Sequence, residues 1–220
     1  MDSLSKSKNS TTATNGFRAE TEICIQPDIK QRLELFFKLP IKGLTRIYGK
    51  KFDIKIEFEN GTETTLQNKD GNGGGRGFSV DRRKVDNFND ESLSVLLNTL
   101  CLKKGTERPK ISDNISKNVI NMCILGVNEE YYPKYFTHTR SDKITRKIIY
   151  MSICTTEDLM NFMYGSLYKD MIPKRTCVHI NPNLYFQRKG GGKKDARPDD
   201  IQMKFILTEE VKKLYTDIFT

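Results

Sequence analysis

Residues 52–69 decide the fold, and they read Phe52-Asp53-Ile54-Lys55-Ile56-Glu57-Phe58-Glu59-Asn60-Gly61-Thr62-Glu63-Thr64-Thr65-Leu66-Gln67-Asn68-Lys69. Apolar and polar residues alternate in the first half, which is typical of a β-strand with one buried face. Asn60-Gly61 favours a tight type I′ turn, which needs positive φ at both central positions. We therefore predict a β-hairpin within residues 45–69, whose first strand buries Ile54, Ile56 and Phe58.

Polar residues from the two ends of this hairpin are expected to meet. Asp53 opens the first strand, and Gln67 and Lys69 close the second. The start of one antiparallel strand lies beside the end of the next, and residues two apart share one face of a sheet. A carboxylate, a neutral oxygen ligand and an ammonium group would therefore converge, an arrangement that suits a hard divalent cation.

This set of residues indicates metal-dependent phosphodiester hydrolysis. Asp53, Gln67 and the carbonyl group of Asn68 are the candidate ligands of Mg²⁺, which prefers oxygen and keeps several waters. Lys69 would orient or deprotonate the attacking water, or stabilise the pentavalent phosphate. An isolated pattern of this spacing also arises by chance, so the alternative is a solvated surface hairpin.

Composition indicates a folded protein with an anionic partner. The chain has 220 residues, 36% of them hydrophobic, with 12 Phe and 9 Tyr to bury, which is enough for one domain with room for a subdomain. The net charge of +9 favours nucleic acid as the partner, and a Lys- and Asn-rich proteome is the alternative explanation.

Cysteine and histidine usage argues against several other sites. None of the five cysteines lies in a CxxC pair, which argues against zinc and a disulfide framework and favours a reducing compartment. His138 and His179 are the only histidines, so a histidine-metal nuclease is disfavoured and both are expected to be structural.

The polar start lacks a signal peptide, and no apolar run approaches the ~20 residues of a membrane span. We expect a cytoplasmic protein without a membrane partner.

Periodicity gives a coarse map of the chain. Residues 1–15 are predicted to be a disordered tail, and residues 16–220 a single domain. Helices are expected over 29–39, 92–102 and 208–219, with Thr208 as the N-cap of the last one. A further helix is expected to start within 155–158 and to carry a buried stripe from Leu159 to Leu167. Beyond the hairpin, strands are expected over 119–127, 177–188 and 201–207. The fold class is therefore α/β, with a central mixed β-sheet flanked by helices.

Two glycine-rich basic segments are candidate DNA contacts. The loop at residues 71–77 follows Lys69 directly and matches neither a Walker A loop nor a dinucleotide fingerprint. The segment 180–207 combines Gln and Arg, which match base edges in the major groove, with lysines on a glycine loop. Solvated connectors are the alternative for both. The candidate DNA-binding residues are Arg76, Arg82, Arg83, Gln187, Arg188, Lys189, Lys193, Lys194, Gln202 and Lys204.

Three segments together resemble type II restriction endonucleases of the PD-(D/E)XK superfamily, in the subgroup with QxK in place of ExK that cuts short GC-rich palindromes. The first is Gly16-Phe17-Arg18-Ala19-Glu20, which resembles a GF-x-x-E helix opening. The second is the hairpin with Gln67-Asn68-Lys69, followed by Arg76-Gly77-Phe78. The third is Gln187-Arg188-Lys189-Gly190-Gly191 with Gln202-Met203-Lys204. Phe52 departs from the Pro or Ser of the family motif, and Gln67 from its usual Glu.

The resemblance implies a restriction-endonuclease-like sheet and Mg²⁺-dependent cleavage of double-stranded DNA at a short palindromic site, leaving 5′-phosphates. It implies catalytic roles for Asp53, Gln67, Lys69 and, from the N-terminal helix, Glu20. The missing charge at Gln67 implies weaker metal binding. The protein would act as a monomer or a homodimer. A non-catalytic basic DNA-binding protein and a repair or recombination nuclease are the alternatives.

Overall fold

The computed structural model describes residues 8–71, 77–84, 117–167, 172–174, 177–188 and 200–219. Contacts divide the chain into two compact units, where the sequence predicts a single domain. The first unit comprises Met1–Gly74, Tyr131–Thr156 and Tyr215–Thr220, and the second comprises Gly75–Glu130 and Glu157–Leu214. The predicted helix over 92–102 lies outside the described residues, as do Arg76, Lys189, Lys193 and Lys194.

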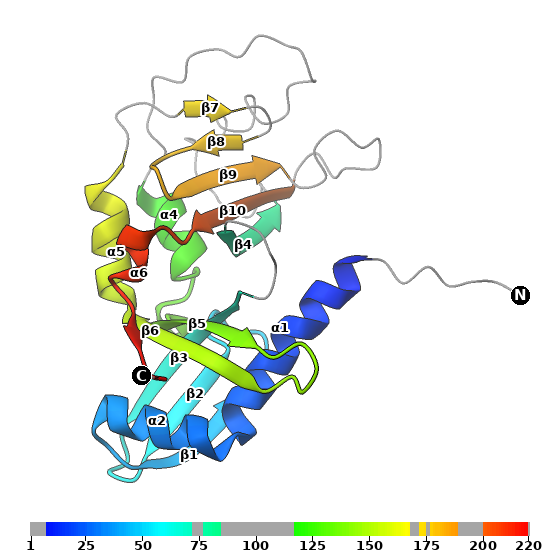
Figure 1. Cartoon of the computed structure of the whole chain (residues 1–220). Helices are drawn as coiled ribbons and strands as arrows, with labels where there is room; N and C mark the ends of the chain where they lie inside the picture. Colours follow the sequence, from blue (N-terminus) through cyan, green and yellow to red (C-terminus); the bar gives the residue numbers. More distant parts are fainter. Residues whose placement is uncertain are drawn as a thin grey trace, which may run out of the picture. The chain divides into compact units, whose positions relative to one another are not determined.

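The first unit is built on a six-stranded mixed sheet (Figure 1), with strand order β1-β2-β3-β5-β6-β11. Neighbouring strands are antiparallel except β3 and β5, which are parallel. Its strands are β1 (Ile41–Arg46), β2 (Ile54–Phe58), β3 (Glu63–Asp70), β5 (Tyr135–Ser141), β6 (Ile148–Thr155) and β11 (Thr216–Asp217). The helices are α1 (Lys8–Ile25) and α2 (Pro27–Phe37), and both pack on β1. The mixed α/β sheet flanked by helices confirms the predicted fold class.

Helix α1 begins inside the range that the sequence predicts as a disordered tail. Residues 8–15 continue the helix that carries Phe17 and Glu20, while residues 1–7 lie outside the described part. The prediction for 8–15 rested on a polar composition, and Ser, Thr and Asn lower helix propensity by well under ~1 kcal/mol each. Helix α1 gives way to α2 at Pro27, which occupies the first turn of α2 because a proline needs no backbone donor there.

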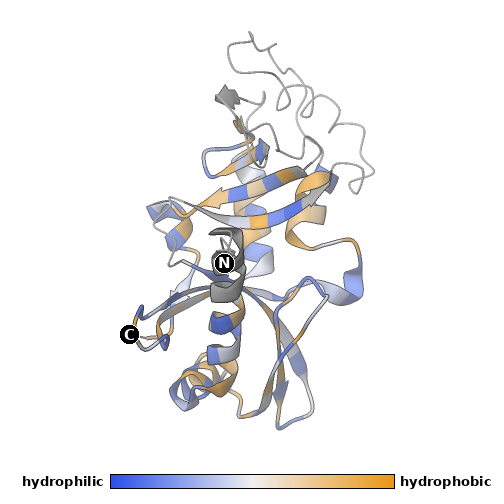
Figure 2. Ribbon diagram, turned by 90° about the vertical axis from the view of Figure 1, so that its right-hand side faces the viewer, coloured by the Kyte–Doolittle hydropathy of each residue, from blue (hydrophilic) through white to orange (hydrophobic). Residues whose placement is uncertain are grey.

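The hydrophobic core of this unit lies between the two helices and one face of the sheet. Ile54, Ile56 and Phe58 of β2 are buried, as their alternation predicts, and they pack with Ile23 and Leu33 of the helices. The alternation of hydrophobic and hydrophilic residues is visible along the strands in Figure 2. Edge-to-face aromatic contacts at one end of this core involve Phe36, Phe37, Phe58 and Tyr135.

The turn between β2 and β3 differs from the predicted type I′ turn. Its loop has three residues, Glu59 to Gly61, and only Gly61 has positive φ, at 81°. The Gly61 amide donates to the Phe58 carbonyl at 3.0 Å, and the Phe58 amide donates to the Thr62 carbonyl at 2.9 Å. This is a type I turn followed by a left-handed residue. Asn60 keeps negative φ because its Oδ1 accepts from the Thr62 amide at 3.0 Å instead.

The second unit contains a five-stranded antiparallel sheet that the sequence does not predict as a separate sheet, with strand order β4-β10-β9-β8-β7. Its strands are β4 (Gly77–Lys84), β7 (Ile172–Lys174), β8 (Cys177–His179), β9 (Leu184–Arg188) and β10 (Asp200–Ile206). The helices are α4 (Lys117–Ile124), which packs on β4, α5 (Thr156–Gly165) and α6 (Glu209–Lys212). The first residue of α5 and the last residue of the 3₁₀ turn η2 (Glu129–Tyr131) belong to the first unit. No described helix is long and apolar enough to cross a membrane.

Three predicted elements of this unit need correction. Residues 119–124, predicted as a strand, belong to α4. The predicted strand over 177–188 is a hairpin of β8 and β9. The predicted closing helix ends at Lys212, although Thr208 caps it as expected by accepting the Val211 amide at 3.3 Å. The chain then enters β11, which pairs with β6 at the edge of the first sheet, and this pairing replaces further helix.

Replacement of Gly61 by alanine is expected to destabilise the protein by about 1 kcal/mol, because positive φ suits glycine and strains an alanine. Gly16→Ala is the matched control, since Gly16 lies within α1 with open space around its Cβ position. That variant should be neutral or up to ~1 kcal/mol more stable. Urea unfolding of both variants tests this pair, and equal effects of the two changes would contradict the turn geometry.

Candidate active site

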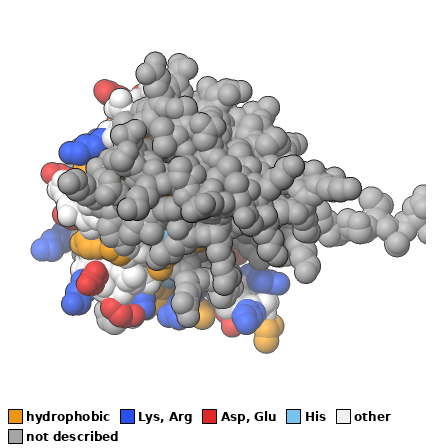
Figure 3. All heavy atoms as spheres, turned by 90° about the horizontal axis from the view of Figure 1, so that it is seen from above, with side chains coloured by type: hydrophobic (Ala, Val, Ile, Leu, Met, Phe, Trp, Pro, Cys, Tyr) orange, Lys and Arg blue, Asp and Glu red, His pale blue; other side chains and the backbone are white. Residues whose placement is uncertain are grey.

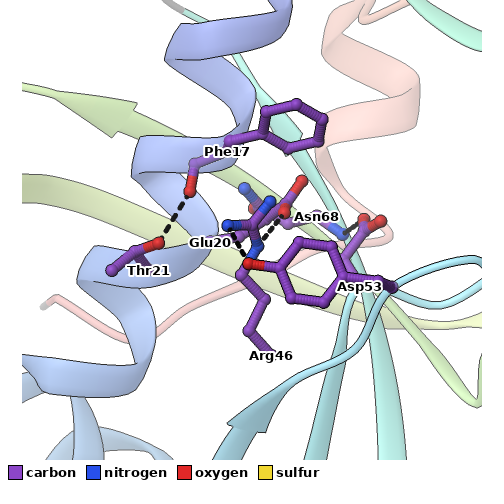
Figure 4. A network of polar contacts seen from close by, with 7 residues as sticks. Phe17, Glu20, Thr21, Arg46, Asp53 and Asn68 are labelled. Carbon is purple, nitrogen blue, oxygen red and sulfur yellow. Dashed lines mark hydrogen bonds and ion pairs between the residues drawn. The ribbon is translucent and has the colours of Figure 1, made fainter.

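The ladder between β2 and β3 holds Asp53 against the end of the second strand. Ile54 pairs with Leu66, and Asp53 directly precedes β2. The Asp53 amide donates to the Leu66 carbonyl at 2.9 Å, and its Oδ2 accepts the Asn68 amide at 2.8 Å. The carboxylate therefore meets the backbone of β3 between Gln67 and Lys69 (Figure 4 shows Asp53 and Asn68). The convergence that the sequence predicts is present in the fold, although Asp53 lies just outside the strand.

Helix α1 adds a second carboxylate from Glu20. Its Oε2 accepts a 2.7 Å hydrogen bond from Nε of Arg46, the last residue of β1, and both side chains are mostly buried. Burial raises the pKa of Glu20, and the nearby charge of Asp53 raises it further, while Arg46 and Lys69 act in the opposite direction. Glu20, predicted from the resemblance alone, is thus electrostatically coupled to Asp53 and Lys69.

The charge of Asp53 is held at an energetic cost. Burial raises the pKa of Asp53, and Lys69 is the strongest influence that lowers it, followed by the hydrogen bond from the Asn68 amide. Two largely buried carboxylates therefore lie within electrostatic range of each other. The nearby cations do not lower their pKa values back to the ordinary range. Such a site favours an added positive charge.

Gln67 supplies an unsatisfied oxygen at the same place. Its side chain is 5% exposed, and within the described part of the chain its Oε1 accepts no hydrogen bond. A buried polar atom without a partner costs about 1–3 kcal/mol, so its retention needs a reason. An oxygen-preferring cation is a suitable partner. No group of three or more His, Cys, Asp or Glu that could hold a metal exists among the described residues, so neutral oxygens would have to complete any coordination shell.

The side chain of Asn68 does not serve as a ligand in this arrangement. Its Oδ1 accepts hydrogen bonds from the hydroxyls of Thr137 and Thr139 on β5, at 2.9 and 3.1 Å. All three side chains are buried. The two threonines fix the side chain of Asn68, while its backbone amide donates to Asp53. Only the carbonyl group of Asn68, as the sequence analysis specified, is left as a candidate ligand.

The parallel pairing of β3 with β5 places His138 beside the predicted lysine. Lys69 pairs with His138 in the ladder. The imidazole covers Gly71, where an added Cβ would overlap Nε2, and packs edge-on against the Tyr150 ring with centroids 5.9 Å apart. A side chain at position 71 would displace the imidazole, so Gly71 is required here by packing. These packing contacts are compatible with the structural role predicted for His138, which stays a prediction.

Register in the second unit aligns three of the predicted DNA-binding residues. Gln202 of β10 pairs with Arg82 of β4 on one side and with Gln187 of β9 on the other. Directly paired residues of antiparallel strands share a face of the sheet. Lys204 lies two residues further along β10, so it belongs to the same face. Gln202 is buried, whereas Arg82 is exposed.

Arg83 and Arg188 occupy a different row. Both pair with Ile201, which alternates with Gln202 along β10 and is 1% exposed. The sequence treats Gln187 and Arg188 as equivalent candidates, but adjacent strand residues alternate between the two faces. The register therefore separates Arg188 from the row of Arg82, Gln202 and Gln187.

Sequence reasoning missed Arg46, Thr137 and Thr139. Arg46 is one arginine among 37 Lys and Arg residues, and nothing near it marks the partner on α1. The threonines lie about 70 positions beyond Asn68, at separations of 69 and 71. Only the β3–β5 pairing brings them together, and no local pattern could have found them.

Asp53→Asn is expected to stabilise metal-free protein near about pH 7, because a raised pKa means that folding disfavours the ionised carboxylate. The penalty is fully present above the folded-state pKa and disappears as the pH falls below the ordinary value of 3.8. Urea unfolding at neutral and acidic pH with a chelator measures the difference. A less stable variant at neutral pH would contradict the electrostatics.

Asp142→Asn is the control of opposite sign. The pKa of Asp142 is lowered by hydrogen bonds from the amide and hydroxyl of Thr145 and from the Ile144 amide. Its contribution to stability is present above the ordinary pKa and is lost as the pH falls through the lowered one. The Asn variant should therefore be less stable than wild type near neutral pH.

No model of a known protein family matches the sequence, and no curated protein matches it. Among solved structures, the chain is similar to a crystal structure of the restriction endonuclease MspI in complex with its cognate DNA. The TM-score is 0.48 and the sequence identity 13%, and the match covers 89% of this chain and 87% of that chain. That protein is a restriction endonuclease, the class that the sequence motifs resemble, but a likeness of this size assigns no activity.

Proposed function

We propose that this protein is a sequence-specific endonuclease of the type II restriction class, which hydrolyses double-stranded DNA with Mg²⁺ and leaves 5′-phosphates. The proposal rests mainly on one observation. Asp53 accepts the Asn68 backbone amide on β3, between Gln67 with its unsatisfied oxygen and Lys69, and Glu20 of α1 lies within electrostatic range of Asp53 and Lys69. The net charge of +9 supports an anionic substrate.

The residues present fit a hard cation. The carboxylate of Asp53, Oε1 of Gln67 and the Asn68 carbonyl would hold Mg²⁺, which accepts few protein ligands and keeps several waters. When bound, the ion supplies a water of lowered pKa and neutralises charge that develops on the phosphate. The burial of Glu20 and Asp53 supports the same fit, because burial raises the pKa of both carboxyl groups, the charge of Asp53 raises that of Glu20 further, and a bound cation would stabilise the ionised forms.

Side chains of the protein would orient the metal ligand, the attacking water and the phosphate. Asp53 is oriented by the Asn68 amide, which the two β5 threonines fix in turn. The Lys69 ammonium lies within electrostatic range of both carboxylates. It would orient the attacking water or stabilise the negative charge of the pentavalent phosphate. Arg46 keeps Glu20 in place through the 2.7 Å ion pair.

The row of Arg82, Gln202 and Gln187 on β4, β10 and β9 supports a role in DNA binding. Glutamine amides pair with adenine edges, and arginine with guanine or phosphate. A non-catalytic DNA-binding protein would use the same row. Site-specificity separates the restriction class from a repair or recombination nuclease, because only the former cuts a long DNA into discrete fragments.

Lys69→Ala and Asp53→Ala are expected to lower cleavage of plasmid DNA by at least about 10³-fold, because each removes a group from the metal and phosphate site. Binding measured in Ca²⁺ should change by less than about fivefold. Lys55→Ala is the matched control, since Lys55 lies on β2, close to Asp53 in the chain, but makes ion pairs with Glu57 of β2 and Glu63 of β3. It should cut as wild type does.

Three results would contradict the proposed function. Cleavage in Mg²⁺ by purified Lys69→Ala protein at the wild-type rate would remove Lys69 from the chemistry. Binding without any nicking by wild type, in Mg²⁺ and in Mn²⁺, would favour the non-catalytic alternative. A smear in place of discrete bands from a sequenced plasmid would favour the repair or recombination nuclease.

Gln187→Ala is expected to cost about 1–3 kcal/mol of binding to the cognate duplex and much less on a scrambled one, if Gln187 reads a base edge. Arg188→Ala removes the next residue, which belongs to the other row. Comparison of the two variants shows which residue reads a base. Gel-shift titrations with both duplexes measure this. Equal losses on both duplexes would make the residue a phosphate contact.

A further inference from the structure

A cluster of aromatic and basic residues lies directly before Asp53 and is not part of the predicted DNA-binding set. It comprises Phe17 of α1, Arg46 at the end of β1, and Tyr48, Lys50 and Lys51 of the loop between β1 and β2, and we name it the β1–β2 loop surface. The Ile47 amide donates to the Asp53 carbonyl at 2.8 Å, which closes the loop at its base. The loop is therefore anchored to the residue that the proposed chemistry uses.

Arg46 is the centre of this surface. Its guanidinium lies over the Phe17 ring at 4.6 Å and over the Tyr48 ring at 4.4 Å. Its Nε donates to Glu20 and its Nη1 to the Tyr48 hydroxyl at 2.8 Å. These two bonds use two of the five N–H groups of the guanidinium. Stacking between the two rings fixes the orientation of the Arg46 guanidinium, whose planar set of N–H groups matches the geometry of a phosphate.

The rings themselves face solvent. Phe17 is 53% exposed and Tyr48 71% exposed, whereas the Arg46 side chain between them is only 16% exposed. Cation–π contacts stabilise by about 0.5–1 kcal/mol at exposed sites, so these contacts offset little of the cost of leaving two aromatic rings in water. Figure 4 shows Phe17 and Arg46 in the same close view as Asp53 and Asn68.

Basic residues extend the surface along the loop. The Lys50 ammonium lies over the Tyr131 ring at 4.4 Å, and Lys51 and Arg46 both lower the pKa of Asp53. Three cations are thus gathered within seven residues of the carboxylate. On the face shown in Figure 3, both basic and acidic side chains are visible among the described residues.

We propose that the β1–β2 loop surface binds the sugar–phosphate backbone of a DNA duplex next to the site of cleavage. Arg46 and Lys50 contact phosphates, and the Tyr48 and Phe17 rings pack against deoxyribose. Such contacts are independent of sequence and position the strand relative to Asp53. This inference rests on the proposed function for the choice of substrate, but it concerns binding and is tested without cleavage.

The chain contains no tryptophan, so Tyr48→Trp introduces a single fluorescent reporter into the surface. A mixed-sequence duplex of about 20 base pairs, added in Ca²⁺ to prevent cutting, is expected to quench its emission. Leu35→Trp on α2, at a residue 72% exposed, is the matched control and should keep its emission. An unchanged Tyr48→Trp signal, under conditions in which a gel shift shows complete binding, overturns the proposal.

Salt dependence gives a second readout. Lys50→Ala is expected to weaken binding roughly fivefold at ~0.1 M salt and to reduce the slope of log K against log salt by about 1, as the loss of one phosphate contact requires. Lys30→Ala, which removes an exposed α2 lysine paired with Glu34, should change neither. An unchanged slope for Lys50→Ala contradicts the phosphate contact.

The two proposals fail separately. A protein that cuts DNA while its Tyr48→Trp variant shows no quenching keeps the nuclease assignment and loses the β1–β2 loop surface. A protein that shows quenching and the slope change but never cuts keeps the surface and loses the chemistry. Quenching by both reporters alike would show unspecific adsorption and would also overturn the proposal.

Discussion

The hydrogen bond from the Asn68 amide to Asp53 is the interaction on which the candidate site depends. It joins a residue just before β2 to the end of β3, and without it the carboxylate would be free to turn toward solvent. Asn68 lies within β3, and its side-chain oxygen accepts hydrogen bonds from two buried threonine hydroxyls of β5. A parallel strand pair and an antiparallel hairpin therefore meet at one residue. The central position of β3 in the sheet makes this possible.

The electrostatics of the site oppose stability and favour ligand binding. Burial raises the pKa values of Glu20 and Asp53, and their mutual repulsion raises that of Glu20 further. Gln67 adds a buried oxygen without a hydrogen bond among the described residues. A protein selected for stability alone would replace such groups by apolar ones, since unpaired buried polarity is destabilising. In the proposed function, a bound cation would compensate for these groups.

Local signals in the sequence predict an element correctly where residues close together in the chain determine it. Alternation over Ile54, Ile56 and Phe58 predicted the buried face of β2, and Thr208 was recognised as a helix cap. The Asn60-Gly61 turn was placed correctly, but its type was wrong because a three-residue loop relieves Asn60 of positive φ. The apolar segment from Val119 was predicted as a strand and forms α4, because a short apolar run fits either element and packing on β4 decides.

The sequence by itself determined the hairpin, its polar end and the residue types that suit a metal and a phosphate, because these depend on spacing within about twenty positions. Tertiary structure alone decided what surrounds them. The β3–β5 pairing supplied Thr137 and Thr139, helix packing brought Glu20 to Arg46, and strand register aligned Arg82, Gln202 and Gln187 in one row. The physical reason is that partners distant in the chain are chosen by burial and strand register, which leave no local pattern in the sequence.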